Sequence, residues 1–598
     1  MRFKSSKVDG YQAFAVTGTN TVSFGINFDG ADTAGLLGFA VERKGPGGGK
    51  PLDMYGYKVF PSIVPKPDNK TTVKTSQHPI QSFVWDDFTA HPGKKYEYSF
   101  RPLKGTPKNI DRSARPIKIS IRTEQLFSKL EHDIFFNRGV ASSQAYVRKF
   151  GNKRPDRLSP AKRKEAEEWL SRQLDEAILQ FVENTKKGDT LLCCFYEFRY
   201  LPVAAALKSA IDRGVKVRII VDAKVNKHKD KKSGKMVESF PREDNLRMLK
   251  QSGIPMENVI LRANKPSNIQ HNKFMVLLKR QKGAIPEVWT GSTNLSMGGF
   301  HGQTNVGHWV RNKKVAAVYK TYWQLLSADP GPKKGESRSI ALKKNKQWRT
   351  SVEALAEVPT ALKDVPKGIT CVFSPRGGEK VLSMYARMVD GADDVSCITL
   401  AFGISDVFKT VLSDNTADSH IAFFLLEKED KPNPRSKKPF VTLNAKNNVY
   451  KAWGSYLHDP VYQWAKETNA KALALNTHVS YIHSKFLLKD PLSTDPIVVT
   501  GSANFSKAST NDNDENMLII RGERRVADIY FTEFNRLFYH YYFRSIQEKN
   551  RKLSPSEIKK SNAQSLFLDE NDRWLKKYKP RSLKKKRVEI FSKMKGFS

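Results

Sequence analysis

The feature of the sequence that most constrains its fold is an order of apolar segments and polar motifs that occurs twice. In both copies, apolar strand-like runs alternate with amphipathic helical segments, which is typical of an α/β layer architecture. Each copy then contains the same two motifs. They read His271-Asn272-Lys273 with Gly291-Ser292-Thr293-Asn294, and His483-Ser484-Lys485 with Gly501-Ser502-Ala503-Asn504. We therefore expect two similar α/β/α lobes that together form a pseudo-dimer.

Changes of pattern along the chain predict four segments. The first carries short alternating runs separated by Gly, Pro and Asn clusters, and this predicts a small β-sandwich-like accessory domain. The last is rich in Lys and Arg and is expected to be solvated. The predicted segments are 1–123 (sandwich), 124–350 (first lobe), 351–548 (second lobe) and 549–598 (basic C-terminal tail).

Within the first lobe, Pro160–Thr185 is predicted to be a single amphipathic helix. Each lobe is expected to end in an aromatic-rich helix, Val315–Leu326 in the first and Val526–Tyr542 in the second. A Pro- and Lys-rich stretch at 328–367 separates the two copies.

Net charge is the most informative bulk property of the chain. Its 102 Lys and Arg against 61 Asp and Glu give a formal charge of +41. Such a surface attracts polyanions, because nucleic acid gains from counterion release and an anionic membrane surface attracts the same charge. Basic runs at Lys224–Lys235 and Lys431–Lys438 add to this tendency.

Four cysteines lie in apolar runs and match no zinc-ligand spacing: Cys193, Cys194, Cys371 and Cys397. We expect them to be small core residues in a reducing compartment. The segment Met1–Gly10 lacks the apolar core of a signal peptide, and no stretch has the length needed to span a bilayer. The expected location is therefore cytoplasmic.

The paired His and Lys residues are the candidate chemistry. Residues two apart in a strand point to the same side, so each pair should project into one space where a single ligand could meet both pairs. Cleavage of a phosphodiester needs a nucleophile, a proton for the leaving oxygen and positive charge around the remaining oxygens. The imidazoles supply the first two, and Lys273 and Lys485 supply the third. Asn294 and Asn504 can donate further hydrogen bonds to these oxygens, and this set of residues requires no metal.

These residues resemble the paired HKD motifs, His-x-Lys-x4-Asp followed by Gly-Ser-x-x-Asn, of the phospholipase D superfamily. The likeness covers about residues 130–545, with one residue between Gly-Ser and Asn in both copies. Asp490 completes the second motif, whereas Leu278 stands at that position in the first. The resemblance implies hydrolysis through a phosphohistidine without cofactor, with Asp490, Ser292 and Ser502 as supporting residues.

The roles of the two histidines are predicted from their downstream partners. Glu515 is expected to orient His483, and Gln303 to orient His271. Because a carboxylate stabilises imidazolium and an amide does not, His483 is predicted to be the protonated general acid and His271 the neutral nucleophile. Tyrosyl-DNA phosphodiesterases, which resemble this chain in lacking one Asp and in their Gln/Glu asymmetry, also attack with the N-terminal histidine.

The substrate is left open by the motifs, because the family acts on several phosphodiesters. The positive charge favours nucleic acid, and thus a nuclease, over phospholipid. A phospholipase D that hydrolyses phospholipid head groups is the alternative, since an anionic lipid surface would attract the same charge. A third hypothesis, suggested by Leu278, is a catalytically decayed adaptor that binds nucleic acid or membrane. No obligate protein partner is evident.

Overall fold

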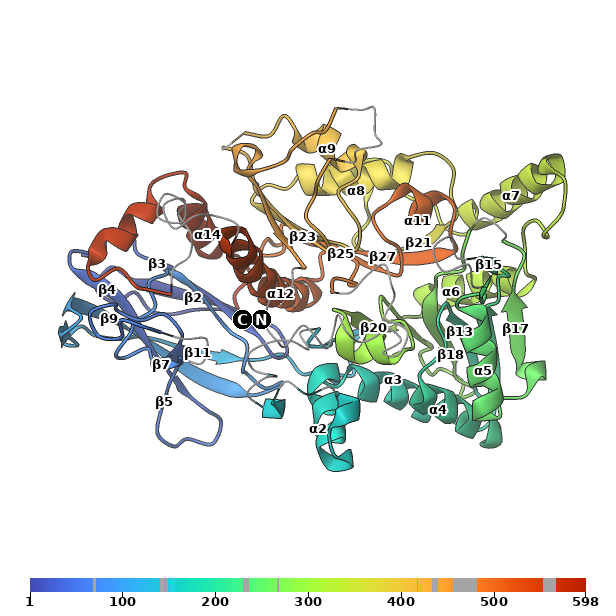
Figure 1. The fold of residues 1–598 in the computed structure, drawn as a ribbon, viewed down its shortest axis with the longest axis horizontal. Helices are drawn as coiled ribbons and strands as arrows, with labels where there is room; N and C mark the ends of the chain where they lie inside the picture. Colours follow the sequence, from blue (N-terminus) through green and yellow to red (C-terminus); the bar gives the residue numbers. More distant parts are fainter. Residues whose placement is uncertain are drawn as a thin grey trace.

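The N-terminal domain and the two lobes pack side by side (Figure 1) in a computed structural model of the chain. The termini meet where the N-terminal domain joins the second lobe, and Ser598 N donates to Arg2 O at 2.7 Å. The structure describes residues 1–67, 71–139, 146, 149–151, 153, 155–229, 236–265, 268–416, 418–432, 439–454, 481–551 and 566–598.

The N-terminal domain consists of two antiparallel sheets that enclose an aromatic core. Alternation along the strands places Tyr96, Tyr98 and Phe100 inside, with Phe24 against Tyr98 at a ring distance of 4.7 Å. This confirms the predicted β-rich domain. One sheet has the order β1 (Arg2–Lys4), β2 (Gln12–Thr17), β3 (Val22–Asn27), β8 (Val84–Asp87); the other has β10 (Asn109–Asp111), β9 (Lys95–Thr106), β4 (Leu36–Lys44), β5 (Leu52–Asp53), with β11 (Ile117–Arg122) also on β9.

The C-terminal segment packs against this domain, so the prediction of a solvated tail is wrong for residues 566–598. The indole of Trp574 is buried and donates to Leu36 O at 2.8 Å, and the Tyr578 hydroxyl accepts from Phe83 N at 3.1 Å. These residues belong to η7 (Asp572–Tyr578), and the following α14 (Leu583–Ser592) covers β3. Residues 552–565 of the predicted tail lie outside the described residues.

The two lobes contain seven-stranded mixed sheets of identical order, which confirms the predicted duplication. In each sheet, three neighbouring strands are parallel and the others are antiparallel. The first sheet runs β12 (His132–Phe136), β20 (Val306–Arg311), β19 (Glu287–Gly291), β18 (Lys273–Leu278), β13 (Thr190–Phe195), β14 (Lys216–Asp222), β17 (Val259–Arg262). The second runs β21 (Gly368–Ser374), β27 (Glu515–Arg521), β26 (Ile497–Gly501), β25 (Phe486–Lys489), β22 (Val395–Leu400), β23 (Ile421–Leu426), β24 (Val449–Trp453).

Each sheet is buried on both faces, as its continuous apolar strands predict. Cys193 packs among the outer helices, whereas its neighbour Cys194 faces the interior between the lobes. All four cysteines are buried free thiols, as expected. The outer helices are α3 (Leu174–Glu183), α4 (Leu201–Asp212) and α5 (Arg242–Ser252) on the first lobe, and α8 (Lys380–Asp390) and α9 (Asp406–Leu412) on the second.

The closing helix of each lobe packs against both lobes. Helix α6 (Lys313–Ser327) contacts β18 and β19 of its own sheet and β21 of the other. Helix α12 (Arg524–Arg551) contacts β25 and β26 of its own sheet, β12 of the first lobe and β2 of the sandwich. A single apolar core therefore runs from the sandwich through the interface between the lobes.

One helix prediction needs correction, and one helix was not predicted. The predicted helix Pro160–Thr185 is two helices, α2 (Pro160–Ser171) and α3, because Arg172 and Gln173 take left-handed φ values of 49° and 70°. This break turns the Arg172 guanidinium inward to Glu533 at 2.7 Å. The Pro- and Lys-rich stretch also contains a helix, α7 (Arg338–Glu353), which buries Trp348.

A buried histidine pair at the lobe interface predicts acid sensitivity. His132 Nδ1 lies 2.9 Å from His308 Nε2, and His308 Nδ1 lies 3.2 Å from the Tyr530 hydroxyl. Burial, with Arg525 and Arg311 nearby, lowers the pKa of His132 to about 3, and burial lowers that of His308 well below its ordinary value. The unfolded chain therefore binds more protons below about pH 6.5, and folding stability falls as the pH drops towards 3.

We expect each of these histidines to contribute a loss of about 2 kcal/mol between pH 7.5 and 5. The test compares urea unfolding midpoints at pH 7.5 and 5 for the wild type and His132→Gln/His308→Gln. The double variant should show the smaller decrease, whatever its midpoint at pH 7.5. An equal decrease in both proteins would show that this pair is not the acid-sensitive element.

Candidate active site

Two equivalent strands, β18 and β25, carry the predicted His and Lys pairs into one buried space. His271 and His483 precede these strands, and the exposed fractions of His271, Lys273, His483 and Lys485 are 6%, 3%, 2% and 1%. Each lysine Nζ donates to the carbonyl of its own histidine at 2.5 Å. This contact keeps each ammonium group beside its imidazole, as the two-residue spacing predicts.

Reciprocal backbone contacts join the two pairs across the lobes. In one contact, His271 N donates to Asp514 O at 2.9 Å, and Asp514 N donates to Ile269 O at 3.0 Å. In the other, Thr304 N donates to Tyr481 O at 2.7 Å. The segment before each histidine thus lies against the segment before β27 or β20 of the opposite lobe. The two half-sites therefore form one centre.

The partner of each histidine comes from the opposite lobe, which contradicts both predicted pairings. His271 Nδ1 lies 2.9 and 3.0 Å from the carboxylate oxygens of Glu515, and His483 Nδ1 lies 2.8 Å from Asn305 Oδ1. Glu515 therefore orients His271 rather than His483, and Asn305 rather than Gln303 is the amide partner. The reason is the cross-lobe pairing, which brings the start of β27 to His271 and the start of β20 to His483.

Asn305 was missed by the sequence analysis, although the spacing indicates it. Asn305 follows Asn294 by eleven residues (294 to 305), and Glu515 follows Asn504 by the same interval (504 to 515). Gln303 lies two residues earlier, at the end of the π-helical turn Gly298–Gly302. Its carbonyl oxygen accepts from Asn137 Nδ2 at 2.7 Å, so its backbone supports the loop.

The Gly-Ser motifs hold these orienting residues in place. Ser292 Oγ donates to Asn305 Oδ1 at 2.8 Å, and Ser502 Oγ donates to Glu515 Oε2 at 2.7 Å. Both serines thus have the supporting position expected of them. A Cβ on Gly291 or Gly501 would lie 2.2 Å from a carbonyl oxygen of the adjacent strand, so only glycine permits this close approach.

The two motif asparagines have different surroundings. Asn294 is buried and its Nδ2 donates to Glu197 Oε1 at 2.8 Å, while Glu197 also pairs with Arg199. Asn504 is only partly buried. The Oδ1 atoms of both asparagines are buried without a hydrogen-bond partner in the described part of the chain. The sequence analysis missed Glu197, which lies just beyond β13 and outside both motifs.

Asp490 has the structural role expected of it. Its carboxylate accepts from the backbone N–H groups of Asp393 at 2.9 Å and Asp394 at 2.8 Å, and so joins β25 to the turn before β22. In the first lobe, Asp189 precedes β13 and accepts from Arg280 N, just after β18, at 2.8 Å. In the first lobe, β18 and β13 are therefore joined by a carboxylate that precedes β13 instead of one that follows β18. This contact compensates for Leu278 at the Asp position of the motif.

Carboxylates also hold the loops that precede the histidines. Asp222 accepts from Gln270 N at 3.0 Å, and Glu427, at the equivalent position in the second lobe, accepts from Ile482 N at 2.7 Å. The Asp514 carboxylate accepts from Lys265 Nζ at 2.6 Å and from the Trp348 indole at 2.9 Å. Neighbours from two segments, the loop after β17 and helix α7, thus fix the backbone that contacts His271.

Burial and crowding of positive charge dominate the electrostatics. Burial lowers the pKa of Lys273 to about 8 and that of Lys485 well below its ordinary value, and Lys273 lowers the latter further. Burial and both ammonium groups lower the pKa values of His271 and His483. Burial raises the pKa of Glu515 to about 8 against the opposing charge of Lys273. A bound anion would stabilise the charged forms of both lysines and both histidines.

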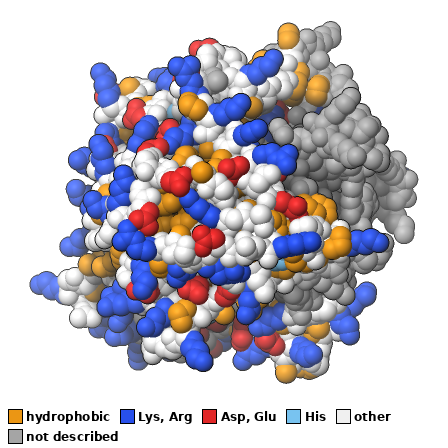
Figure 2. Space-filling model, turned by 90° about the vertical axis from the view of Figure 1, so that its left-hand side faces the viewer, with side chains coloured by type: hydrophobic (Ala, Val, Ile, Leu, Met, Phe, Trp, Pro, Cys, Tyr) orange, Lys and Arg blue, Asp and Glu red, His pale blue; other side chains and the backbone are white. Residues whose placement is uncertain are grey.

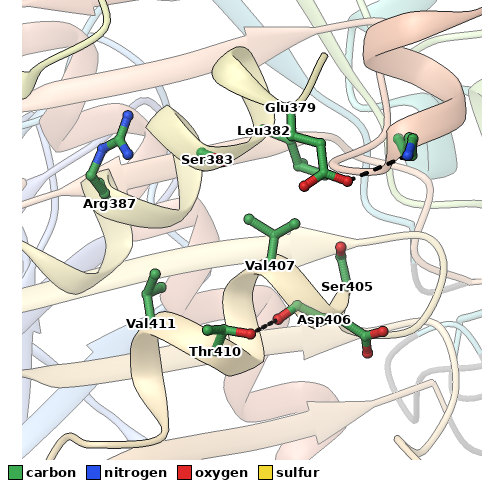
Figure 3. A pocket seen from close by; sticks show the side chains of 10 residues that line it. Glu379, Leu382, Ser383, Arg387, Ser405, Asp406, Val407, Thr410 and Val411 are labelled. Carbon is green, nitrogen blue, oxygen red and sulfur yellow. Dashed lines mark hydrogen bonds and ion pairs between the residues drawn. The ribbon is translucent and has the colours of Figure 1, made fainter. Parts of the chain in front are cut away.

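Other features of the described chain lie outside this centre. A hollow of about 560 Å³ separates α8 from α9 on the second lobe (Figure 3), and the Glu379–Lys507 ion pair of 3.4 Å lines it. Within the described residues, no three His, Cys, Asp or Glu side chains are arranged to hold a metal ion. No helix in this part of the chain is long and apolar enough to cross a membrane.

Comparisons with known proteins match two regions of the chain to one family. The family described as "Cardiolipin synthase, PLD-like domain" matches residues 178–326 and 430–538, one region in each lobe. No curated protein sequence matches the chain.

Several solved structures are similar, all with low TM-scores. A phosphatidylserine synthase from Haemophilus influenzae has 10% identity and a TM-score of 0.39, covering 61% of this chain and 84% of its own. A polyphosphate kinase from Porphyromonas gingivalis has 11% identity and a TM-score of 0.35, covering 59% of this chain, which spans only 46% of the kinase. Nuc, a phospholipase D family member from Salmonella typhimurium, has 22% identity and a TM-score of 0.19, covering 25% of this chain and 84% of its own. The family match shows that residues 178–326 and 430–538 of this chain, one region in each lobe, are PLD-like, as the resemblance of the paired motifs implied.

Proposed function

We propose that this chain is a metal-independent phosphodiester hydrolase that acts on nucleic acid through a phosphohistidine intermediate. The observation that carries the proposal is the cross-lobe centre, in which two imidazoles with fixed Nδ1 partners lie beside two buried ammonium groups. The retention of both pairs, and the Asp189 contact that compensates for Leu278, argue against a decayed site.

The hydrogen bonds define the tautomer of each imidazole. Glu515 and His271 Nδ1 share one proton, and the hydrogen bond that Ser502 Oγ donates to Glu515 Oε2 favours the carboxylate, which leaves that proton on Nδ1. The Asn305 amide is oriented by Nδ2, which donates to Gly299 O at 2.8 Å, so its Oδ1 accepts from His483 Nδ1. Both rings therefore keep Nδ1 protonated and leave Nε2 for the reaction.

The corrected pairing supports His271 as the nucleophile, but for a reason opposite to the sequence argument. Attack through Nε2 turns a ring protonated at Nδ1 into a phosphorylated imidazolium, and the Glu515 carboxylate beside Nδ1 stabilises that positive charge. The Asn305 amide carries no charge, so the imidazolium of His483 releases its proton readily. That property suits a general acid.

The reaction then has two steps. The Nε2 lone pair of His271 attacks phosphorus while the bond to the leaving oxygen breaks, and His483 Nε2–H gives its proton to that oxygen. His483 next takes a proton from water, the resulting hydroxide attacks phosphorus, and the P–N bond electrons return to His271. Lys273 and Lys485 stabilise the negative charge on the non-bridging oxygens in both steps.

Nucleic acid is the substrate class that the charge of +41 favours. Lys and Arg side chains are spread over the described part of the face shown in Figure 2, among fewer acidic ones. Residues 230–235 and 433–438 of the two basic runs lie outside the described residues. A polyanion that follows such a surface would bring a phosphodiester to the interlobe centre.

The substrate prediction uses single- and double-stranded DNA, RNA and phosphatidylcholine vesicles, all in EDTA. We expect release of oligonucleotides without release of choline, and a loss of at least about 100-fold in His271→Asn and His483→Asn. Release of choline alone would instead show a phospholipase. Binding of nucleic acid without turnover in the wild type would show an adaptor.

The histidine roles are tested with a p-nitrophenyl phosphodiester of thymidine, whose leaving group needs no proton. His483→Asn should release one equivalent of p-nitrophenol per site in a burst and then stall as the phosphohistidine, because it lacks the group that activates water. His271→Asn should show no burst. The reverse pattern would exchange the two roles.

The partners of the histidines give a third prediction. Glu515→Gln keeps a hydrogen-bond acceptor but removes the charge, so formation of the intermediate should slow by about 100-fold or more. Asn305→Asp places a carboxylate beside His483 and raises the pKa of its imidazole, so the alkaline limb of the pH–rate profile should move to higher pH. An Asn305→Asp profile identical to the wild type would contradict the pairing of Asn305 with the general acid.

A further inference from the structure

The two half-sites differ in residue type at one pair of positions that are equivalent by strand register. Leu192 in β13 lies opposite Val276 in β18, and Cys397 in β22 lies opposite Leu488 in β25. Five residues after Leu192 and Cys397, both strands have ended, and the backbone lies at the edge of each sheet where the histidines lie. The first lobe has Glu197 there, and the second has Phe402.

In the first lobe, this position is closed. The Glu197 side chain is 1% exposed, accepts from Asn294 Nδ2 and pairs with Arg199, whose guanidinium lies 5.0 Å from the Phe240 ring. Asn294 is therefore fixed by the protein itself. In this half-site, the position beside the motif asparagine is therefore filled by a buried carboxylate that the protein itself pairs.

In the second lobe, the same position is open. Phe402 is 49% exposed and is followed by the exposed Gly403, so no side chain of the next residue covers the ring. Asn504 has an aromatic residue at the position where Asn294 has a carboxylate, and its Oδ1 is buried without a hydrogen-bond partner in the described chain. A large exposed ring and a buried acceptor without a partner are each unfavourable, unless a ligand stacks on the ring and donates a hydrogen bond to the acceptor.

We propose that Phe402 and Asn504 form a subsite for the nucleobase on the leaving-group side of the cleaved phosphodiester; this inference rests on the proposed nuclease function. A nucleobase offers a planar face that stacks on an aromatic ring and N–H groups that can donate to Asn504 Oδ1. An acyl chain offers neither. The side follows from the mechanism, because the second lobe carries His483, which protonates the leaving oxygen.

The test compares an oligonucleotide with the same molecule lacking only the base on the leaving side. Phe402→Ala should lower kcat/KM for the intact oligonucleotide by about 5- to 100-fold, the effect of losing one base–aromatic stack, and should leave cleavage of the abasic molecule nearly unchanged. Phe402→Trp should restore cleavage of the intact molecule. Tyr55→Ala, which removes a 53% exposed aromatic from the sandwich, is the matched control and should match the wild type on both.

Each alternative outcome has a distinct meaning. Equal loss on both oligonucleotides would make Phe402 a structural residue, and no loss on either would show that no base stacks there. Reduced binding to phosphatidylglycerol vesicles, with nucleic acid cleavage intact, would make Phe402 a membrane contact and overturn the subsite. A wild type that cleaves no nucleic acid would overturn the proposed function itself, before any variant is compared.

Discussion

The exchange of histidine partners across the lobe interface is the contact on which the rest of the structure depends. Neither lobe alone holds its own histidine, because His271 takes its carboxylate from the second lobe and His483 takes its amide from the first. The shared core beneath the centre, with α6 and α12 each packed against both sheets, keeps the two segments in register. Separation of the lobes would therefore disorient both imidazoles together. The orientation of the two histidines consequently depends on the packing of the two lobes against each other.

Periodicity and motif duplication predicted the fold well, because both record local patterns. The sandwich strands, the two sheets and the placement of the His and Lys pairs follow from alternation and from residue types two apart. The predictions that failed concern features that depend on contacts between residues far apart in the sequence. The break at Arg172 depends on burial of its guanidinium against Glu533, and the packing of Trp574 depends on the N-terminal domain, where its indole donates to Leu36 O. The pairing of Glu515 with His271 depends on which lobe supplies each strand, although the equal spacing of Asn305 and Glu515 was available in the sequence.

The comparison of the lobes shows which features of the duplicated unit are interchangeable. The carboxylate that joins two strands comes from Asp490 after β25 in one lobe and from Asp189 before β13 in the other, and both accept backbone N–H groups at the same junction. The chemistry requires only that this junction be held, so the Asp of the motif can be absent. The Gly-Ser pair is less replaceable, since a Cβ on either glycine would overlap a carbonyl oxygen of the neighbouring strand. Motif positions where a Cβ would overlap the neighbouring backbone thus constrain the residue type more strongly than a position whose carboxylate another strand can supply.

Burial of two ammonium groups and two imidazoles costs free energy in the empty site, as the lowered pKa values of all four groups show. The protein offsets only part of this cost, with Glu515 near the lysines and Glu197 at the edge. An incoming phosphodiester anion supplies the missing negative charge, and the pKa values of Lys273, Lys485 and His483 should rise as it binds. Substrate binding would then protonate the general acid that the first step needs. The proton on His483 therefore depends on the negative charge of the substrate. The buried lysines and histidines destabilise the empty site, and the same groups become charged and ready to react when the substrate binds.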